Sequence, residues 1–122
     1  MEGEQNNRGR MLSAISNGIL GIHREQYGRG ADRARTIMHG DYVACFLEGI
    51  FTPVEHTLIK AGKFDQVRET RQSFQDALSD EFRAVVEQHT GRKVAAFFSQ
   101  IHRDPDMALE GFALEPLPGQ QS

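Results

Sequence analysis

Residues 34–50 read ARTIMHGDYVACFLEGI, and the rest of the architecture is built around them. Two runs rich in β-formers flank Gly40-Asp41, a pair with glycine first, which suits a two-residue type II′ turn. Such a turn fixes the register and places His39 opposite Tyr42. We therefore expect a β-hairpin here.

The register gives the hairpin two different faces, because side chains alternate along a strand. One face is small and mostly apolar and is the expected core side: Ala34, Thr36, Met38, Val43, Cys45 and Leu47. The other face is mixed: Arg33, Arg35, Ile37, Tyr42, Phe46 and Glu48. The single cysteine excludes an intramolecular disulfide, and its place on the core side favours a small buried hydrophobe over a nucleophile.

Helical patterns surround this hairpin. Apolar residues at helical spacing predict a first helix that ends near Tyr27: Leu12, Ile15, Ile19 and Ile22. Thr52-Pro53-Val54-Glu55 is a helix start, with Thr52 as the cap and Glu55 returning a hydrogen bond to it. A further stripe predicts one long helix that Gly91 closes: Phe64, Val67, Phe74, Leu78, Phe82, Val85 and His89.

A second hairpin is expected over residues 93–101 and 107–114. The order helix, hairpin, helices, hairpin predicts an α+β fold with a four-stranded, largely antiparallel sheet and its helices packed on one face. We expect one domain over residues 8–116, between a disordered N-terminus (1–7) and a disordered tail (117–122).

Composition excludes several functional classes. The formal net charge is −3, and the arginine excess is confined to residues 1–40, so no basic footprint for nucleic acid is expected. No apolar run approaches the ~20 residues needed to cross a bilayer, so no membrane insertion is expected. The single cysteine fits a reducing compartment, and a cytoplasmic location follows. Nothing in the sequence indicates a cofactor.

Arginines in and after the turn Tyr27-Gly28-Arg29-Gly30 form the first candidate site. Arg29, Arg33 and Arg35 present planar forks that suit a carboxylate or phosphate, which makes them candidates for anion binding. The alternative is a glycine turn that ends a helix, followed by strand arginines that pair with Glu48.

The segment His102-Arg103-Asp104-Pro105-Asp106 is the second candidate. An imidazole and two carboxylates within one loop could bind magnesium or manganese, so His102, Asp104 and Asp106 are candidate metal ligands for a metal-binding protein or a metal-dependent enzyme. Asp-Pro-Asp is also an ordinary turn sequence, which accounts for the same residues without a metal.

An interface is the third candidate. If a five-residue loop pairs Ile101 with Met107, then Phe98 and Phe112 join the mixed face of the first hairpin. The candidate interface is therefore Tyr42, Phe46, Glu48, Phe98 and Phe112. A two-fold homodimer would cover such a patch. In the rival arrangement, the first helix covers this face in a three-layer monomer.

The segments YGRGADRARTIMHGDYVACFLEGIFTPVEHTLIKAG (27–62) and TGRKVAAFFSQIHRDPDMALEGFALEP (90–116) resemble the MpsC-like family of small proteins. That family is named after component C of a sodium-linked membrane-potential-generating system. The sequence departs from the family pattern at Ala31, Gln100 and Gly111.

The resemblance supplies no catalytic residues. It implies a non-catalytic accessory or regulatory protein beside a sodium-linked membrane-potential or bicarbonate-related system, held at the inner face of the membrane by a partner protein. It would act through protein contacts and a small anion. A purely structural oligomer is the other alternative.

Overall fold

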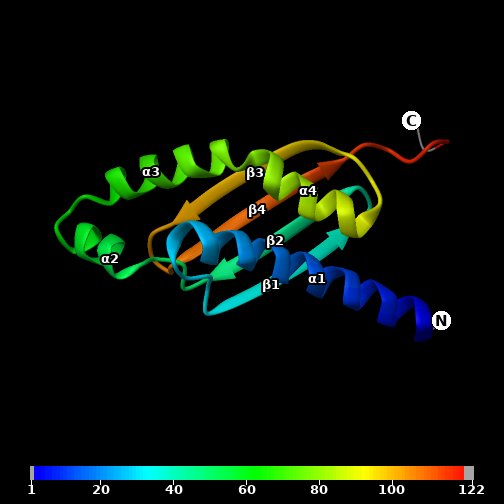
Figure 1. Ribbon diagram of the computed structural model, residues 1–122, viewed down its shortest axis with the longest axis horizontal. Helices are drawn as coiled ribbons and strands as arrows, with labels where there is room; N and C mark the ends of the chain where they lie inside the picture. Colours follow the sequence, from blue (N-terminus) through cyan, green and yellow to red (C-terminus); the bar gives the residue numbers. More distant parts are fainter. Residues whose placement is uncertain (1, 120–122) are drawn as a thin grey trace.

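The computed structural model describes residues 2–119, and its elements follow the expected order (Figure 1). These are α1 (Glu2–Tyr27), β1 (Arg33–His39), β2 (Tyr42–Glu48), α2 (Pro53–Lys60), α3 (Phe64–Ala77), α4 (Ser79–Thr90), β3 (Val94–His102) and β4 (Met107–Leu114). The strands form one antiparallel four-stranded sheet in the order β1-β2-β4-β3. The α+β prediction is confirmed.

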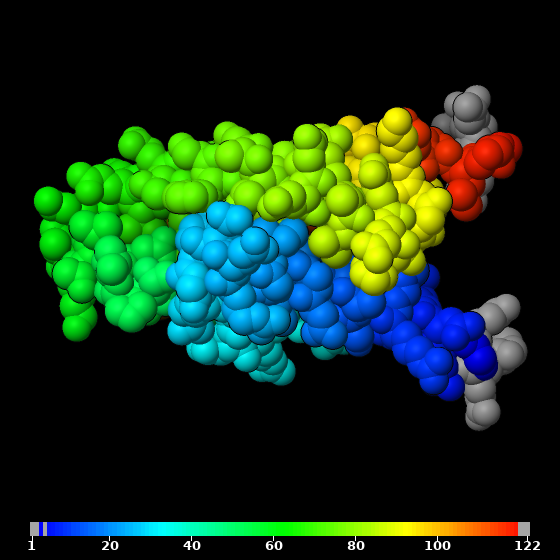
Figure 2. All heavy atoms as spheres, in the orientation of Figure 1, coloured from blue at the N-terminus to red at the C-terminus, as the bar shows by residue number. Residues whose placement is uncertain are grey.

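The helices cover one face of this sheet. Helix α1 packs against β1 and α4, while α3 and α4 pack against β3. Viewed from this side, the molecule shows α1 next to α2–α4, and little of the sheet is visible behind them (Figure 2). The opposite face has no helix over it within residues 2–119, so α1 does not cover it in a third layer.

The β1–β2 hairpin has the register that the turn residues predict. Pairing runs from His39 with Tyr42 to Arg33 with Glu48. Gly40 has φ 58°, as the first central position of a type II′ turn requires. The core side is also as expected, because Val43, Cys45 and Leu47 are 0–1% exposed.

The β3–β4 hairpin differs from the prediction by one residue. His102 pairs with Met107 and Ile101 with Ala108, so the connecting loop is one residue shorter than expected. A slip of one residue moves every side chain of a strand to the other face. Phe112 is therefore 2% exposed on the core side, and its assignment to the interface was wrong.

Glu110 explains why the alternation of side chains along β4 led to a wrong prediction of its buried face. Both alternating sets of β4 contain apolar residues, and the set with Phe112 also holds the only acidic residue of the strand. A charged residue argues for an exposed face. In the structure, Glu110 is 0% exposed beneath the helices together with Ala108, Phe112 and Leu114.

Two helices replace the single long one. The backbone departs from helical dihedral angles at Leu78 (φ −97°, ψ 7°), between α3 and α4. The buried residues of α3 are Phe64, Val67, Arg71 and Gln75, whereas Phe74 is 40% exposed. The inward stripe therefore contains two polar residues that an apolar pattern cannot reveal. Gly91 closes α4 as expected, with φ 69°.

The ends of the chain also differ in part from expectation. Helix α1 starts at Glu2 and so includes residues 2–7, which the sequence predicts to be disordered. It ends at Tyr27 and Gly28 follows with φ 79°, as predicted. Of the predicted tail, residues 117–119 follow the last strand, and 120–122 lie outside the described residues.

Gly18 brings α1 close to α4. A Cβ atom at Gly18 would lie 2.7 Å from Cγ1 of Val85, whereas one at Gly21, on the same helix, would meet nothing within 4 Å. Replacing either glycine by alanine raises the helix propensity of α1 by the same amount. Any difference between them therefore measures the packing of α1 on α4.

We expect Gly18→Ala to be about 1–3 kcal/mol less stable than Gly21→Ala, because overpacking a helix contact costs this much. Urea unfolding of the two variants and the wild type measures the difference. Equal stability of the two variants would show that α1 and α4 are not in close contact at this point.

Candidate functional site

A cluster of polar side chains lies between the helices and the sheet, where a core is normally apolar. Its members are His23 on α1, Arg71 and Gln75 on α3, and Glu110 on β4, each 0–1% exposed. Polar groups of this kind are rarely buried unless they bind one another or a ligand.

Arg71 is held by the start of α2. Its Nε and Nη2 atoms donate to the two carboxylate oxygens of Glu55 at 2.7 and 2.6 Å, and Nη2 also donates to the Ile50 carbonyl at 3.0 Å. The guanidinium stacks on the ring of Tyr27, 3.8 Å from its centroid. One buried cation thus joins α1, α2, α3 and the β2–α2 loop.

Glu55 has two structural tasks. It completes the predicted capping box, since its side chain accepts from the Thr52 amide and the Thr52 hydroxyl accepts from the Glu55 amide. It also neutralises Arg71. Burial raises the pKa of this carboxyl, but the hydrogen bonds from Arg71 and Thr52 outweigh burial and hold the pKa below its usual value.

Glu110 occupies the centre of the cluster. Its Oε1 atom accepts from Gln75 Nε2 at 2.6 Å and from Ser99 Oγ at 3.0 Å. Burial raises its pKa to about 8, in spite of the opposing effects of these hydrogen bonds and of Arg71. Glu110 is therefore largely protonated at neutral pH, which explains how an acid can lie beneath the helices.

His23 is uncharged for the same reason. Burial, reinforced by the positive charge of Arg71, lowers its pKa to about 4. Its ring lies between the rings of Tyr27 and Phe82, and its Nε2 atom is 3.9 Å from Oε1 of Glu110. The cluster thus contains one ion pair and two titratable groups that burial keeps neutral.

Several polar atoms of the cluster, and the hydroxyl of the adjoining Tyr27, have no hydrogen-bond partner among the described residues. They are both ring nitrogens of His23, Tyr27 Oη, Arg71 Nη1, Gln75 Oε1 and Glu110 Oε2. Native proteins leave few such atoms unsatisfied. The cluster therefore has the capacity to bind further polar groups.

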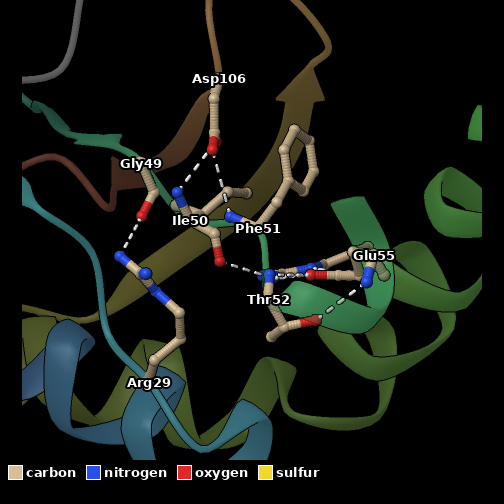
Figure 3. A network of polar contacts seen from close by, with 8 residues as sticks. Arg29, Gly49, Ile50, Phe51, Thr52, Glu55 and Asp106 are labelled. Atoms are coloured by element: carbon tan, nitrogen blue, oxygen red, sulfur yellow. Dashed lines mark hydrogen bonds and ion pairs between the residues drawn. The ribbon is translucent and has the colours of Figure 1, made fainter. Parts of the chain in front are cut away.

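Next to this cluster, three loops meet at residues 49–52 (Figure 3). The carboxylate of Asp106 accepts from the Ile50 and Phe51 amides at 2.9 and 3.3 Å. From the other side, Arg29 donates to the Gly49 carbonyl at 2.6 Å. The structure thus brings the arginine turn and the β3–β4 loop, two separate sequence candidates, to the same stretch of backbone.

The arginine candidates make contacts within the protein. Arg29 also pairs with Asp32 at 2.8 Å, and Arg33 approaches Glu48 at 3.8 Å on the exposed side of the hairpin. Arg35 is exposed on the same strand face. These contacts match the structural alternative for this segment, and anion binding by the three arginines stays a prediction.

The metal candidates serve as turn residues. Asp106 binds backbone amides, and Nδ1 of His102 lies 2.9 Å from the Pro105 carbonyl. Asp104 is exposed. Within residues 2–119, no group of three or more His, Cys, Asp or Glu side chains is arranged to hold a metal ion.

Of the interface candidates, four remain on the face without helices. Tyr42 and Phe98 are 67% and 61% exposed, Phe46 is 38% exposed, and Glu48 is also exposed. Phe112 lies on the other side of the sheet. Cys45 is buried as expected, and burial raises the pKa of its thiol to about 11.

Sequence reasoning missed the polar cluster altogether. The available signal was the spacing of Arg71 and Gln75, which continue the helical series begun by Phe64 and Val67. Glu110 gave a similar signal, because it alternates in phase with Phe112. Only polarity kept these residues out of the expected core.

Comparison with known proteins identified a family. A family model described as "Na+-translocating membrane potential-generating system (MpsC)" matches residues 7–116. Neither the curated proteins nor the solved structures contain a match. Within residues 2–119, no helix has both the length and the apolar character needed to cross a membrane.

Glu110 and His23 make opposite contributions to the pH dependence of stability. The pKa of Glu110 rises from 4.5 to about 8 on folding, so its contribution is fully present below pH 4.5 and is lost as the pH rises to 8. The pKa of His23 falls from 6.5 to about 4, so its contribution is present above pH 6.5 and is lost as the pH falls to 4. Between pH 4.5 and pH 6.5, the changes that the two groups make to the free energy of unfolding cancel.

We therefore expect the wild type to lose stability between pH 6.5 and 8, by up to about 1.4 kcal/mol per pH unit. Glu110→Gln, which copies the neutral side chain, should remove this loss. Urea unfolding between pH 6.5 and pH 8 measures this loss of stability, with Glu81→Gln on the exposed side of α4 as a control. An unchanged loss in Glu110→Gln would rule out Glu110 as its source.

Proposed function

This chain belongs to the MpsC family, and on that basis we propose that it is a non-catalytic accessory subunit of a Na+-linked membrane-potential-generating system. It binds protein partners, and its place is at the cytoplasmic side of the membrane. The family description supports the assignment to this membrane system. The face of the sheet without helices supports the binding of protein partners.

We define the open sheet face as the outward side chains Arg33, Arg35, Ile37, Tyr42, Phe46, Glu48 and Phe98. Its large apolar members are 38–67% exposed. Apolar patches of this kind on a small domain mark interaction surfaces, and aromatic residues with arginine are enriched at interface cores. This exposed aromatic cluster is the observation that carries the proposal.

The occupant that we propose for the open sheet face is a second copy of the chain. The face carries both charge signs, with Arg33 and Arg35 on β1 and Glu48 on β2. Under a two-fold axis, the same surface of each copy meets itself, so arginines of one copy can approach the glutamate of the other. The dimer then joins the membrane system as its accessory subunit.

Phe46→Glu tests the dimer, because it places a charge at the centre of the open sheet face. Val54→Glu is the matched control, since Val54 is 70% exposed on α2, away from that face. In light scattering, we expect the wild type and Val54→Glu to be dimers and Phe46→Glu to be a monomer. A monomeric wild type, or a dimer that tolerates Phe46→Glu, would contradict the proposed interface.

Capture from native membranes tests the accessory role separately. The tagged wild-type protein should retain subunits of a Na+-translocating complex from detergent-solubilised membranes, and Val54→Glu should do the same. Phe46→Glu should retain less if the dimer is the form that binds. A dimer that captures no such subunit would favour a purely structural oligomer over an accessory subunit.

A further inference from the structure

A cleft of about 340 Å3 opens between α3 and the edge strand β3, on the outer side of the polar cluster. Its volume is within the range of small-molecule sites. Arg68 and Gln72 line it from the exposed side of α3. Arg71 and Gln75 in the lining belong to the polar cluster, and Ser99 donates to Glu110 of that cluster. The lining therefore includes buried polar side chains as well as exposed ones.

Arg71, one of the residues that line this cleft, has an unused hydrogen-bonding group. Its Nε and Nη2 atoms are fully engaged by Glu55 and the Ile50 carbonyl, but Nη1 has no partner among the described residues. The side chain is 1% exposed. The two N–H groups of a buried guanidinium nitrogen are strong donors, and an oxyanion is the acceptor that suits them best.

Gln75, one turn further along α3 and also in the lining of the cleft, adds an acceptor. Its Nε2 atom is fixed by Glu110, which also accepts from Ser99, and this leaves Gln75 Oε1 without a partner among the described residues. The Gln75 side chain is also 1% exposed. A ligand that fills both positions must offer acceptor oxygens to Arg71 and a hydrogen-bond donor, such as an O–H group, to Gln75.

From this arrangement, we propose that the cleft binds a small oxyanion that also carries a hydroxyl group, such as hydrogen phosphate or a hydroxy acid. The oxyanion oxygens accept from Arg71 Nη1, and the hydroxyl donates to Gln75 Oε1. Arg68 at the mouth adds a second positive charge, since its side chain is 57% exposed and lines the same cleft. Glu69 is the one acidic residue in the lining.

A comparison of phosphate with sulfate distinguishes the proposed site from nonspecific anion binding. Near neutral pH, phosphate retains a P–OH group, whereas sulfate has no hydroxyl to donate to Gln75. In thermal unfolding of the full chain at matched ionic strength with chloride, phosphate should raise Tm in a saturable manner, and sulfate should do so less. No effect beyond chloride, or equal effects of phosphate and sulfate, would overturn the proposal.

Variants locate the site. Arg68→Glu reverses a charge at the mouth and should weaken phosphate binding about tenfold, while the matched control Arg24→Glu, at an exposed position of α1, should bind as the wild type does. Arg71→Lys keeps a cation beside Glu55 but removes Nη1, and should abolish phosphate-dependent stabilisation. If Arg71→Lys does not fold, Arg68→Glu still decides the question.

A phosphate titration followed by NMR gives a direct readout. The side-chain N–H signals of Arg71 and Gln75 should shift with the same saturation curve as the gain in Tm. Binding that Arg29→Ala removes and Arg68→Glu spares would place the anion at the arginine turn and overturn the assignment to the cleft. The experiment does not depend on the dimer, because Phe46→Glu should bind phosphate as the wild type does.

Discussion

The buried ion pair between Arg71 and Glu55 is the interaction on which the arrangement of the helices depends. Glu55 is fixed by the capping box of α2, and Arg71 reaches it from α3 while stacking on Tyr27 at the end of α1. Removing one partner of such a pair leaves an uncompensated buried charge, which costs far more than the pair contributes. The positions of α1, α2 and α3 are therefore coupled through a single guanidinium.

The same charge shapes the chemistry of the polar cluster. It lowers the pKa of His23, although burial is the larger cause, and it opposes the effect of burial on Glu110. Both groups are uncharged near neutral pH, so the cluster holds one cation and one anion that cancel. What is left over is hydrogen-bonding capacity at Arg71 Nη1 and Gln75 Oε1, the two atoms from which we infer a ligand in the α3–β3 cleft.

The sequence predicts the parts of the fold in which local chemistry and burial agree. Gly40 sets the register of the first hairpin, and Thr52 with Glu55 sets the start of α2, because each acts through its own backbone or its near neighbours. Prediction failed where polar residues take core positions. Glu110 made the wrong face of β4 look buried, because the burial that keeps it neutral comes from helices that are distant in sequence.

A double-mutant cycle on Arg71→Met and Glu55→Gln measures the coupling between these two side chains, since glutamine keeps the capping hydrogen bond and removes only the charge. The free energy of unfolding should fall by about 3–5 kcal/mol in each single variant. The double variant should lose clearly less than the sum of the two. Additive losses would contradict the account, because they would mean that Arg71 and Glu55 stabilise the fold independently.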